Sequence, residues 1–389
     1  MEYFIDTVAL SVNKDGEELC GDQIEIADTK DGRILVLSDG LGSGVKANIL
    51  ATLTSKIAVT MLKEKATLED TIETIMKTLP VCSVRKLSYS TFTIVKAAKD
   101  GTVNIFEFDN PSYFYLDKGV LCEVPKNRRE IHGKIVYEST LKMKIGDQLI
   151  LVSDGVIHAG VGKLLNFGWQ WKDVSAFAED TIRNSGTTFL CHEIMSYTNI
   201  LYDRMPGDDA SVVELSYKEK KTLHLFTGPP KNPTDDKFLA EAFVEARGIK
   251  VISGGTTAKI IADKTGNELK VKLDHLRKDL PPTAVMKGAD LITEGILTMS
   301  RVVDLLKGYR DGKKSTEILQ ELFEDHGASE LSKLILNEAS EVVIWLGTAV
   351  NPAHQSEGFV FNYQKKVEIV HELKKVLLEM GKGVLLYTI

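Results

Sequence analysis

Two aspartates follow apolar runs and precede glycines, a position from which a carboxylate can bind a ligand. Asp39 closes the stretch "ILVLSD" at residues 34–39, and Asp154 closes "LILVSD" at residues 149–154. Four other Asp-Gly pairs lie in polar surroundings, where the two residues merely form turns. An apolar strand, by contrast, carries its terminal carboxylate out of the sheet, where the charge needs a partner. Asp39 and Asp154 are therefore candidates for a binding or catalytic role.

The glycines after Asp39 are compatible with neither of two common nucleotide-binding motifs. Residues 40, 42 and 44 give G-x-G-x-G, so the third glycine of the dinucleotide fingerprint is misplaced, and Asp39 would put a negative charge beside the pyrophosphate. No G-x-x-x-x-G-K-[ST] motif occurs in the chain. A site in which carboxylates hold a hard divalent cation, and the cation meets a phosphate, agrees better with these residues. Because Gly40 has no side chain, its carbonyl group could approach the cation directly.

Further acidic residues extend this candidate metal site. Asp22, in "CGDQ", starts the hairpin that leads to Asp39, and "GDDASVVEL" places Asp208 and Asp209 just before a strand. The zinc signature H-E-x-x-H is absent, because Ser196 occupies the place of its second histidine. Ligation by carboxylates alone selects Mg²⁺ or Mn²⁺.

The elements that must position these aspartates change in character along the chain. Up to Tyr217, strands predominate and hairpins join them, which predicts an α+β domain with a largely antiparallel sheet system covered by helices. The strands are expected at 6–13, 22–28, 33–38, 89–97, 102–108, 112–117, 148–153 and 210–216, and the helices at 44–64, 68–78, 171–183 and 188–202.

After the lysine-rich stretch at 216–221, single strands alternate with single helices. This alternation predicts a second, Rossmann-like α/β domain with a doubly wound, mostly parallel sheet. We therefore expect domains at 1–218 and 219–389. In the second domain the strands are expected at 222–228, 249–255, 289–295, 341–348 and 383–389, and the helices near 234–247, 256–263, 295–308, 314–338 and 363–381.

Composition excludes several classes of partner. The chain has 389 residues with a formal net charge of -7 and no long block of either sign, so neither nucleic acid nor an anionic membrane is an expected partner. We expect no membrane-spanning segment, because no apolar run is long enough to span a bilayer, and the N-terminus lacks the pattern of a secretory signal. The four cysteines are isolated, as is usual for reduced thiols, so a cytoplasmic location is expected.

Five segments occur together, in order, that resemble one family. They are "CGDQ", "SDGLGSGVKA", "FDNPSYFYLDKG", "KIGDQLILVSDGV" and "GDDASVVEL". Over residues 1–217 the chain resembles the PPM family of metal-dependent serine/threonine phosphatases, and within it the bacterial stage II sporulation E-type branch. The resemblance implies an antiparallel β-sandwich flanked by helices, a role in signal transduction, and hydrolysis of phosphoserine or phosphothreonine by water activated between two Mn²⁺ or Mg²⁺ ions, with room for a third ion.

The resemblance also assigns roles to the aspartates. It implies that Asp39 bridges two metal ions, that the carbonyl of Gly40 coordinates one of them, and that Asp22 holds one metal directly or through water. Asp154 and Asp208 would complete the shell of the other metal, so that Asp39, Asp154 and Asp208 form the catalytic set. Asp209 follows where the family has Asp or Asn and would support the site.

Some residues depart from the family pattern and leave substrate recognition open. Asn110 stands where sporulation-type relatives usually have the histidine of Gly-His-Pro-Pro, so the surrounding loop is expected to differ. Arg85, Arg128 and Arg129 are candidate phosphate contacts, although solvated surface charge is the more ordinary role for such arginines. The substrate class implied by the family is a phosphoprotein, such as an anti-sigma-factor antagonist.

Loops at the strand ends of the second domain are candidates for a ligand site, because ligands of open α/β sheets bind there. N-capping and tight turns are the alternative explanation for the same loops. If the loops form a ligand site, the second domain would sense a small molecule or dock a partner. The sequence is also compatible with a homodimer. In the alternative hypothesis, the first domain is a catalytically weak scaffold and the second provides the ligand-binding function. The candidate residues are Gly228, Gly254, Gly255, Thr256, Thr257 and Glu294.

Overall fold

Continuous apolar sequence in the first half of the chain forms strands that are covered on both faces, as in β3 (Gly32–Gly40). Leu35 and Leu37 belong to a core cluster that includes residues of the other sheet of this unit, whereas Ile34 and Val36 pack with helix residues. Because side chains alternate between the faces of a strand, both faces of β3 must be apolar. The run "ILVL" is therefore apolar on both faces because the sheet that contains β3 lies between the other sheet and the helices.

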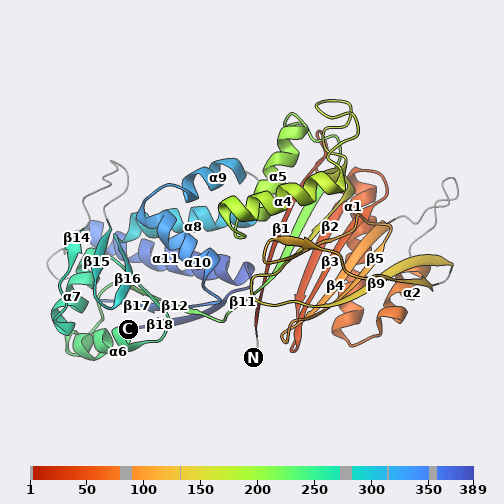
Figure 1. Cartoon of the computed structure of the whole chain (residues 1–389). Helices are drawn as coiled ribbons and strands as arrows, with labels where there is room; N and C mark the ends of the chain where they lie inside the picture. The colour runs from red at the N-terminus through yellow and green to blue at the C-terminus, as the bar shows by residue number, and fades with distance from the viewer. Residues whose placement is uncertain (1–2, 79–89, 132, 272–282, 313–314, 350–356) are drawn as a thin grey trace. The chain divides into compact units, whose positions relative to one another are not determined.

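The computed structural model describes residues 3–78, 90–131, 133–271, 283–312, 315–349 and 357–389. The chain divides into two compact units, Met1–Lys218 and Glu219–Ile389, each of which is described by itself (Figure 1).

Two antiparallel sheets build the first unit. The five-stranded sheet has the order β1 (Phe4–Val12), β11 (Ala210–Lys218), β10 (Gln148–Val152), β6 (Phe114–Asp117) and β7 (Val120–Cys122). The six-stranded sheet has the order β2 (Asp22–Asp28), β3, β4 (Ser90–Ala98), β5 (Thr102–Phe108), β9 (Lys134–Lys142) and β8 (Asn127–Ile131).

Helices cover the outer face of each sheet (Figure 1). The side chains of α1 and α2 pack on the six-stranded sheet, and those of α4 and α5 pack on the five-stranded sheet. The first unit is thus a β-sandwich flanked by helices. Its helices are α1 (Gly44–Lys63), α2 (Leu68–Thr78), the single turn α3 (Asp154–Ile157), α4 (Trp171–Ser185) and α5 (Leu190–Leu201).

Helix α1 is the element of the described chain that is long and apolar enough, by length and composition, to cross a membrane. The composition analysis did not single it out. Its Ala47, Ala51 and Ala58 are fully buried, and Ala58 packs in the cluster that joins the helix to the six-stranded sheet. This packing accounts for part of the apolar character of α1, whereas its Val45, Ile49 and Leu53 are exposed.

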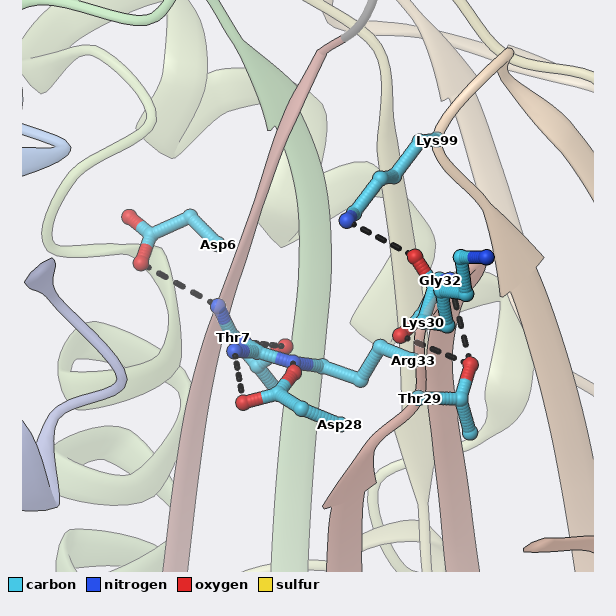
Figure 2. Close-up of polar contacts among 8 residues, drawn as sticks. All are labelled: Asp6, Thr7, Asp28, Thr29, Lys30, Gly32, Arg33 and Lys99. Carbon is cyan, nitrogen blue, oxygen red and sulfur yellow. Dashed lines mark hydrogen bonds and ion pairs between the residues drawn. The ribbon is translucent and has the colours of Figure 1, made fainter.

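A polar cluster ties the turn between β2 and β3 to the other sheet (Figure 2). The buried Arg33 guanidinium donates to both carboxylate oxygens of Asp28, at 2.7 and 3.2 Å, and to the hydroxyl of Thr7 in β1 at 3.1 Å. These contacts lie at the opposite end of the hairpin from Asp22 and Asp39, which face each other in the register of β2 and β3. At one end of this hairpin, hydrogen bonds therefore connect the two sheets, and the other end carries the candidate site.

The second unit contains a seven-stranded sheet whose central strands are parallel. Its strand order reverses at β12, with β13 and β16 on one side and β17 and β18 on the other. Phe226 of β12 packs with α6 and α7, and Leu225, on the other face of the strand, is also fully buried. The strands are β14 (Lys270–Val271), β15 (Ala284–Met286), β16 (Ala289–Thr293), β13 (Ile249–Ser253), β12 (Thr222–Thr227), β17 (Glu341–Leu346) and β18 (Gly383–Thr388) in sheet order.

The helices of the second unit correct one expectation from the sequence. The helix expected over 314–338 is two helices, because His326 caps a new helix: its Nδ1 accepts the Ser329 N–H at 3.1 Å. Apolar residues recur at helical spacing on both sides of this break, so the sequence pattern does not reveal it. The helices are α6 (Asp236–Glu245), which follows a short 3₁₀ turn (Pro233–Asp235), α7 (Gly255–Thr265), α8 (Ile296–Asp311), α9 (Ser315–Leu322), α10 (Gly327–Asn337) and α11 (Glu357–Glu379).

Several strands had no clear signal in the sequence. Strand β8 is mostly exposed and charged, and β9 alternates between exposed and buried side chains without a long apolar run. Strands β7, β14 and β15 are only two or three residues long. The expected strand at 112–117 begins only at Phe114, because residues 111–113 have no regular structure.

Candidate metal centre

The two Ser-Asp-Gly stretches meet although they belong to different sheets. Asp39 lies next to the end of β3, and Asp154 opens the helical turn that follows β10. The Asp154 carboxyl group is near enough to that of Asp39 to contribute to its raised pKa. Asp22 faces Asp39 across the β2–β3 hairpin, and Asp208 and Asp209 immediately precede β11, the neighbour of β10. All five predicted aspartates therefore gather at one edge of the sandwich.

The five carboxyl groups differ in depth. Asp22 and Asp209 are only 3% and 4% exposed. Asp39, Asp154 and Asp208 are half-buried. A reactant from solvent would thus meet the second group first, with the buried pair behind it.

Burial and mutual repulsion raise the pKa values of these carboxyl groups in the protein without bound cations. The pKa of Asp39 is raised to about 9, mainly by desolvation and further by Asp22, Asp154 and Asp208. Desolvation raises the pKa of Asp22 to about 7, the hydroxyls of Ser153 and Ser211 oppose that shift, and Asp209 and Asp154 add to it. The pKa of Asp208 is also raised, mainly by desolvation. Such a cluster costs free energy when it is ionised, and a divalent cation would offset that cost.

Two buried carboxylate oxygens lack hydrogen-bond donors. Among the described residues, Asp22 Oδ2 and Asp209 Oδ2 have no hydrogen-bond partner, whereas Asp209 Oδ1 accepts the backbone N–H of Lys14 at 2.9 Å. A buried, unpaired carboxylate oxygen is costly and is a natural cation ligand. In their present rotamers, no three of the described His, Cys, Asp and Glu side chains converge closely enough to form a ready metal site. The donor set fits a hard divalent cation, and side-chain rotation would complete the ligation.

Two glycines allow the close approaches that form this edge. A Cβ at Gly40 would lie 2.0 Å from the carbonyl oxygen of Ala47 in α1, and a Cβ at Gly155 would lie 2.0 Å from the carbonyl oxygen of Asp209. Any side chain at either position would push α1 or the Asp209 backbone away. The glycine after each aspartate is therefore required by packing, in addition to the carbonyl role proposed for Gly40.

The structure adds neighbours that the sequence analysis did not single out. The Tyr202 hydroxyl donates to the carbonyl of Gly155 at 2.7 Å, and burial together with Asp208, Asp154 and Asp22 raises its pKa. Tyr202 carries no motif of its own, so only the fold places it here.

The serines that precede the two aspartates are both fully buried and occupied in structural contacts. Ser153 Oγ accepts the Ser211 N–H at 2.9 Å. Ser38 Oγ lies 2.7 Å from Ser90 Oγ, which donates to the carbonyl of Asp39 at 2.9 Å. These contacts hold the ends of β3 and β10 in place.

The two described arginines among the candidate phosphate contacts, Arg128 and Arg129, do not lie at this edge. Arg129 lies in β8 and forms ion pairs with Glu69 and Glu138 at 3.0 and 3.2 Å. Strand β8 is four strand spacings from β3, on the order of 19 Å. Arg128 is exposed on the same strand, and Arg85 lies outside the described residues.

Asn110, at the position of the family histidine, does lie close to β4. Its Nδ2 donates to Thr93 Oγ1 at 2.8 Å, and its Oδ1 is buried without a partner.

In the second unit, the candidate ligand residues divide into two places. Gly254 has a φ of 118° and donates its N–H to the carbonyl of Thr293 at 2.9 Å, so the ends of β13 and β16 are joined. A Cβ at Gly255 would lie 3.5 Å from Glu294 Oε1, and one at Gly254 would lie 3.5 Å from Thr257 Oγ1. These residues therefore come together, and Thr256 lies in the first turn of α7 beside them.

Gly228 lies apart from that group, at the end of β12. A Cβ there would meet the carbonyl of Gly347 at 2.6 Å and the ammonium of Lys366 at 2.9 Å. The strand order reverses between β12 and β17, the arrangement at which open α/β sheets form crevices. Burial lowers the pKa of Lys366.

Comparison with known proteins identifies a family for the first unit. Residues 29–218 match the family model of Stage II sporulation protein E (SpoIIE). The match begins after Asp22, which joins the site through its register with Asp39. No curated protein sequence matches the chain significantly.

Solved structures include three with a general likeness to this chain. The PP2C phosphatase domain of SpoIIE from Bacillus subtilis, with a fragment of its regulatory domain, is 19% identical over 56% of this chain and 64% of that one, with a TM-score of 0.47. The RsbU and RsbW domains of a Mycobacterium tuberculosis protein are 16% identical over 56% and 60%, with a TM-score of 0.46. RsbX in complex with magnesium is 18% identical over 56% and 97%, with a TM-score of 0.42.

This chain spans less than two thirds of the first two of these structures. The scores are low, so the assignment rests on the family match and on the segments that carry the resemblance. No family match covers the second unit. Residues 29–218 of this chain are a phosphatase domain of the SpoIIE family.

Proposed function

We propose that this chain is a metal-dependent protein phosphatase that hydrolyses phosphoserine or phosphothreonine. The observation that carries the proposal is that the Asp39 and Asp154 carboxyl groups interact electrostatically, beside two buried carboxylate oxygens that have no hydrogen-bond partner among the described residues. Such an arrangement costs free energy unless it binds cations, and all-oxygen ligands favour Mn²⁺ or Mg²⁺.

We assign each aspartate a role in cation binding according to how deeply its carboxyl group is buried. Asp22 and Asp209 would hold cations from the protein side, and Asp39, Asp154 and Asp208 would hold them from the side that a phosphate ester reaches. Two bound divalent ions acidify water and neutralise charge on the phosphoryl oxygens. Because the pKa of Asp39 is raised, this group is protonated at neutral pH when no cation is bound, and it would have to lose that proton to bind one. Cations and protons would therefore compete for the carboxyl groups.

Lys14 is the candidate for contact with the substrate phosphoryl group. Its positive charge partly opposes the rise in the pKa of Asp208, which is caused mainly by desolvation, and its backbone N–H donates to Asp209 Oδ1. An ammonium beside half-exposed ligands can meet an incoming anion.

For the second unit, we propose a sensor or partner-binding role at the carboxyl ends of its parallel strands. The group around Gly254 and Glu294 is one candidate location, and the group around Gly228 and Lys366 is the other. The Glu294 carboxylate lies near the N-terminus of α7 and would repel an anionic ligand there. The group around Gly228 and Lys366 is therefore the better candidate for binding an anion. The phosphoprotein substrate is proposed by family analogy to be an anti-sigma-factor antagonist.

The direct test is hydrolysis of p-nitrophenyl phosphate with added Mn²⁺ or with a chelator. We expect turnover that requires the metal and falls by at least about a thousandfold in Asp39→Asn, because hydrolysis of such esters without catalysis is extremely slow. The matched control is Asp31→Asn, another Asp-Gly aspartate at the turn of the same hairpin. Its activity should equal that of the wild type.

Equal turnover with metal and with chelator would overturn the proposal. Absence of turnover under all conditions, in a folded protein, would instead favour the scaffold hypothesis for the first unit.

A further inference from the structure

A cavity of about 480 Å³ lies at the outer end of the five-stranded sheet, beside β6 and β7. Its volume falls in the range typical of pockets that bind small groups, about 300–1,000 Å³. None of the predicted metal ligands lines it. The walls include Ser112, Tyr113, Leu121, Val124, Lys126 and Trp171.

The aromatic wall of this pocket is held in place by neighbours. The Trp171 ring stacks on the buried Phe114, with ring centroids 4.7 Å apart, and its Nε1 donates to the carbonyl of Ser112 at 2.8 Å. Tyr113 is only 5% exposed. A pocket with fixed aromatic and aliphatic walls is preorganised for an apolar group, which would lose little free energy to rearrangement of the protein.

The one ammonium group in this wall is already neutralised. Lys126 Nζ pairs with Glu107 at 2.5 Å, bonds to Ser112 Oγ at 2.9 Å and lies 4.6 Å from the centre of the Tyr113 ring. Glu107 is buried and also accepts the Tyr113 N–H at 3.1 Å. The Lys126–Glu107 pair is neutral and Glu123 adds one carboxylate to the wall, so the pocket does not favour an anionic ligand.

The pocket lies close to the aspartate edge of the sandwich. Ser112 and Tyr113 precede Phe114, which faces Ile150 of β10, and β10 leads directly to Asp154. Strand β7 is two strand spacings from β10, or about 10 Å. An extended peptide covers that distance in about three residues.

We propose that this pocket binds an apolar side chain of the phosphoprotein substrate, about two to four residues from the phosphorylated residue. The inference rests on the proposed phosphatase function. On this proposal, residues of β7 and of the loop after it select the substrate. None of the aspartates of the family motifs lies in this part of the chain.

The test uses phosphoserine peptides with an alanine background and a single phenylalanine placed at each position on either side of the phosphoserine. In the full-length protein with Mn²⁺, phenylalanine at one position should raise kcat/KM at least tenfold, mainly by lowering KM. Val124→Trp, which fills the pocket, should abolish that preference and leave turnover of p-nitrophenyl phosphate unchanged. The matched control is Val120→Trp, because Val120 lies in the same segment but is 61% exposed outside the pocket.

A binding readout separates this proposal from the phosphatase proposal. N-acetylphenylalaninamide at millimolar concentration should shift the indole N–H signal of Trp171 in the wild type and in Asp39→Asn, and should not shift it in Val124→Trp. Because Val124 also packs against the core between the sheets, Val124→Ser is the second variant, and it should weaken both effects without filling the pocket.

Three outcomes would overturn the proposal. They are peptide hydrolysis without any preferred phenylalanine position, a preference that survives in both Val124 variants, and an unperturbed Trp171 signal. Failure of the phosphatase proposal would appear separately, as no phosphate released from any ester. If the amide then still shifted the Trp171 signal, the pocket would bind a ligand other than a substrate.

Discussion

At the scale of single residues, the candidate centre is a set of carboxyl groups that the fold brings together at an electrostatic cost. Asp22 and Asp209 are buried, each with one oxygen that has no hydrogen-bond partner among the described residues, and the Asp154 carboxyl group helps to raise the pKa of Asp39. A folded protein retains such a cluster when binding compensates for it, because buried charges without partners are otherwise selected against on stability alone. The same cost makes the cluster sensitive to pH.

In a chelator, the first unit should lose stability as the pH rises from about 5 to about 9. The unfolded carboxyl groups ionise near their ordinary pKa of 3.8, whereas folded Asp22 and Asp39 keep their protons up to about pH 7 and 9. The folded state therefore binds more protons in that window, and the free energy of unfolding falls by up to about 1.4 kcal/mol per pH unit for each full proton of difference. Urea unfolding followed by tryptophan fluorescence in a Trp345→Phe background measures this, and Asp39→Asn should show a shallower decline.

At the scale of elements, the site depends on how closely α1 approaches the end of β3. The approach is possible because Gly40 presents no side chain to Ala47. Strand β3 supplies Asp39, and the same junction starts α1, whose alanine face packs into the unit. The position of the metal ligand and the packing of the helix are thus set by one short segment.

Gly40→Ala should destabilise the first unit by about 1–3 kcal/mol, because its Cβ would lie 2.0 Å from the carbonyl oxygen of Ala47. Displacement of Asp39 by about 1 Å should also reduce turnover of p-nitrophenyl phosphate by on the order of a hundredfold. Gly255→Ala is the control, because its nearest contact would be at 3.5 Å and it lies in the second unit. Equal effects of the two substitutions on turnover would contradict the packing role of Gly40.

At the scale of the whole molecule, the chain consists of two units with separate cores, joined between Lys218 and Glu219. The predicted metal ligands all belong to the first unit, and the second contributes its own sheet. Units with independent cores are expected to unfold in separate transitions. A ligand of one unit should therefore stabilise that unit selectively.

Mn²⁺ at about 100 times its Kd should stabilise the first unit by about 2.7 kcal/mol, or roughly 5–10 °C in Tm. Trp169 and Trp171 report on the first unit and Trp345 on the second. Thermal scans of Trp345→Phe and of the double variant Trp169→Phe/Trp171→Phe separate the two signals. A metal-induced shift in the Trp345 signal of the same size would show that the units unfold together.

The sequence by itself identified the candidate metal ligands, because the relevant signals are local. The apolar runs that end at Asp39 and Asp154 predict strands with terminal carboxylates, and β2 and β5 have the bounds expected from the pattern. The alternation after residue 221 predicts parallel strands, which pair as such. Local periodicity could not reveal the break before His326, because the apolar pattern continues across it.

Only the tertiary structure decided how these residues combine. Asp39 and Asp154 influence each other electrostatically because a strand of each sheet ends at the same edge, and strands such as β10 and β11 pair residues that are far apart in the chain. The same long-range pairing buries Asp209 more deeply than Asp208 and brings Tyr202 to the site. It also forms the pocket that Trp171 shares with β7. A sequence pattern describes the faces and ends of one element, whereas a site depends on which elements become neighbours, and that is determined by the packing of the whole unit.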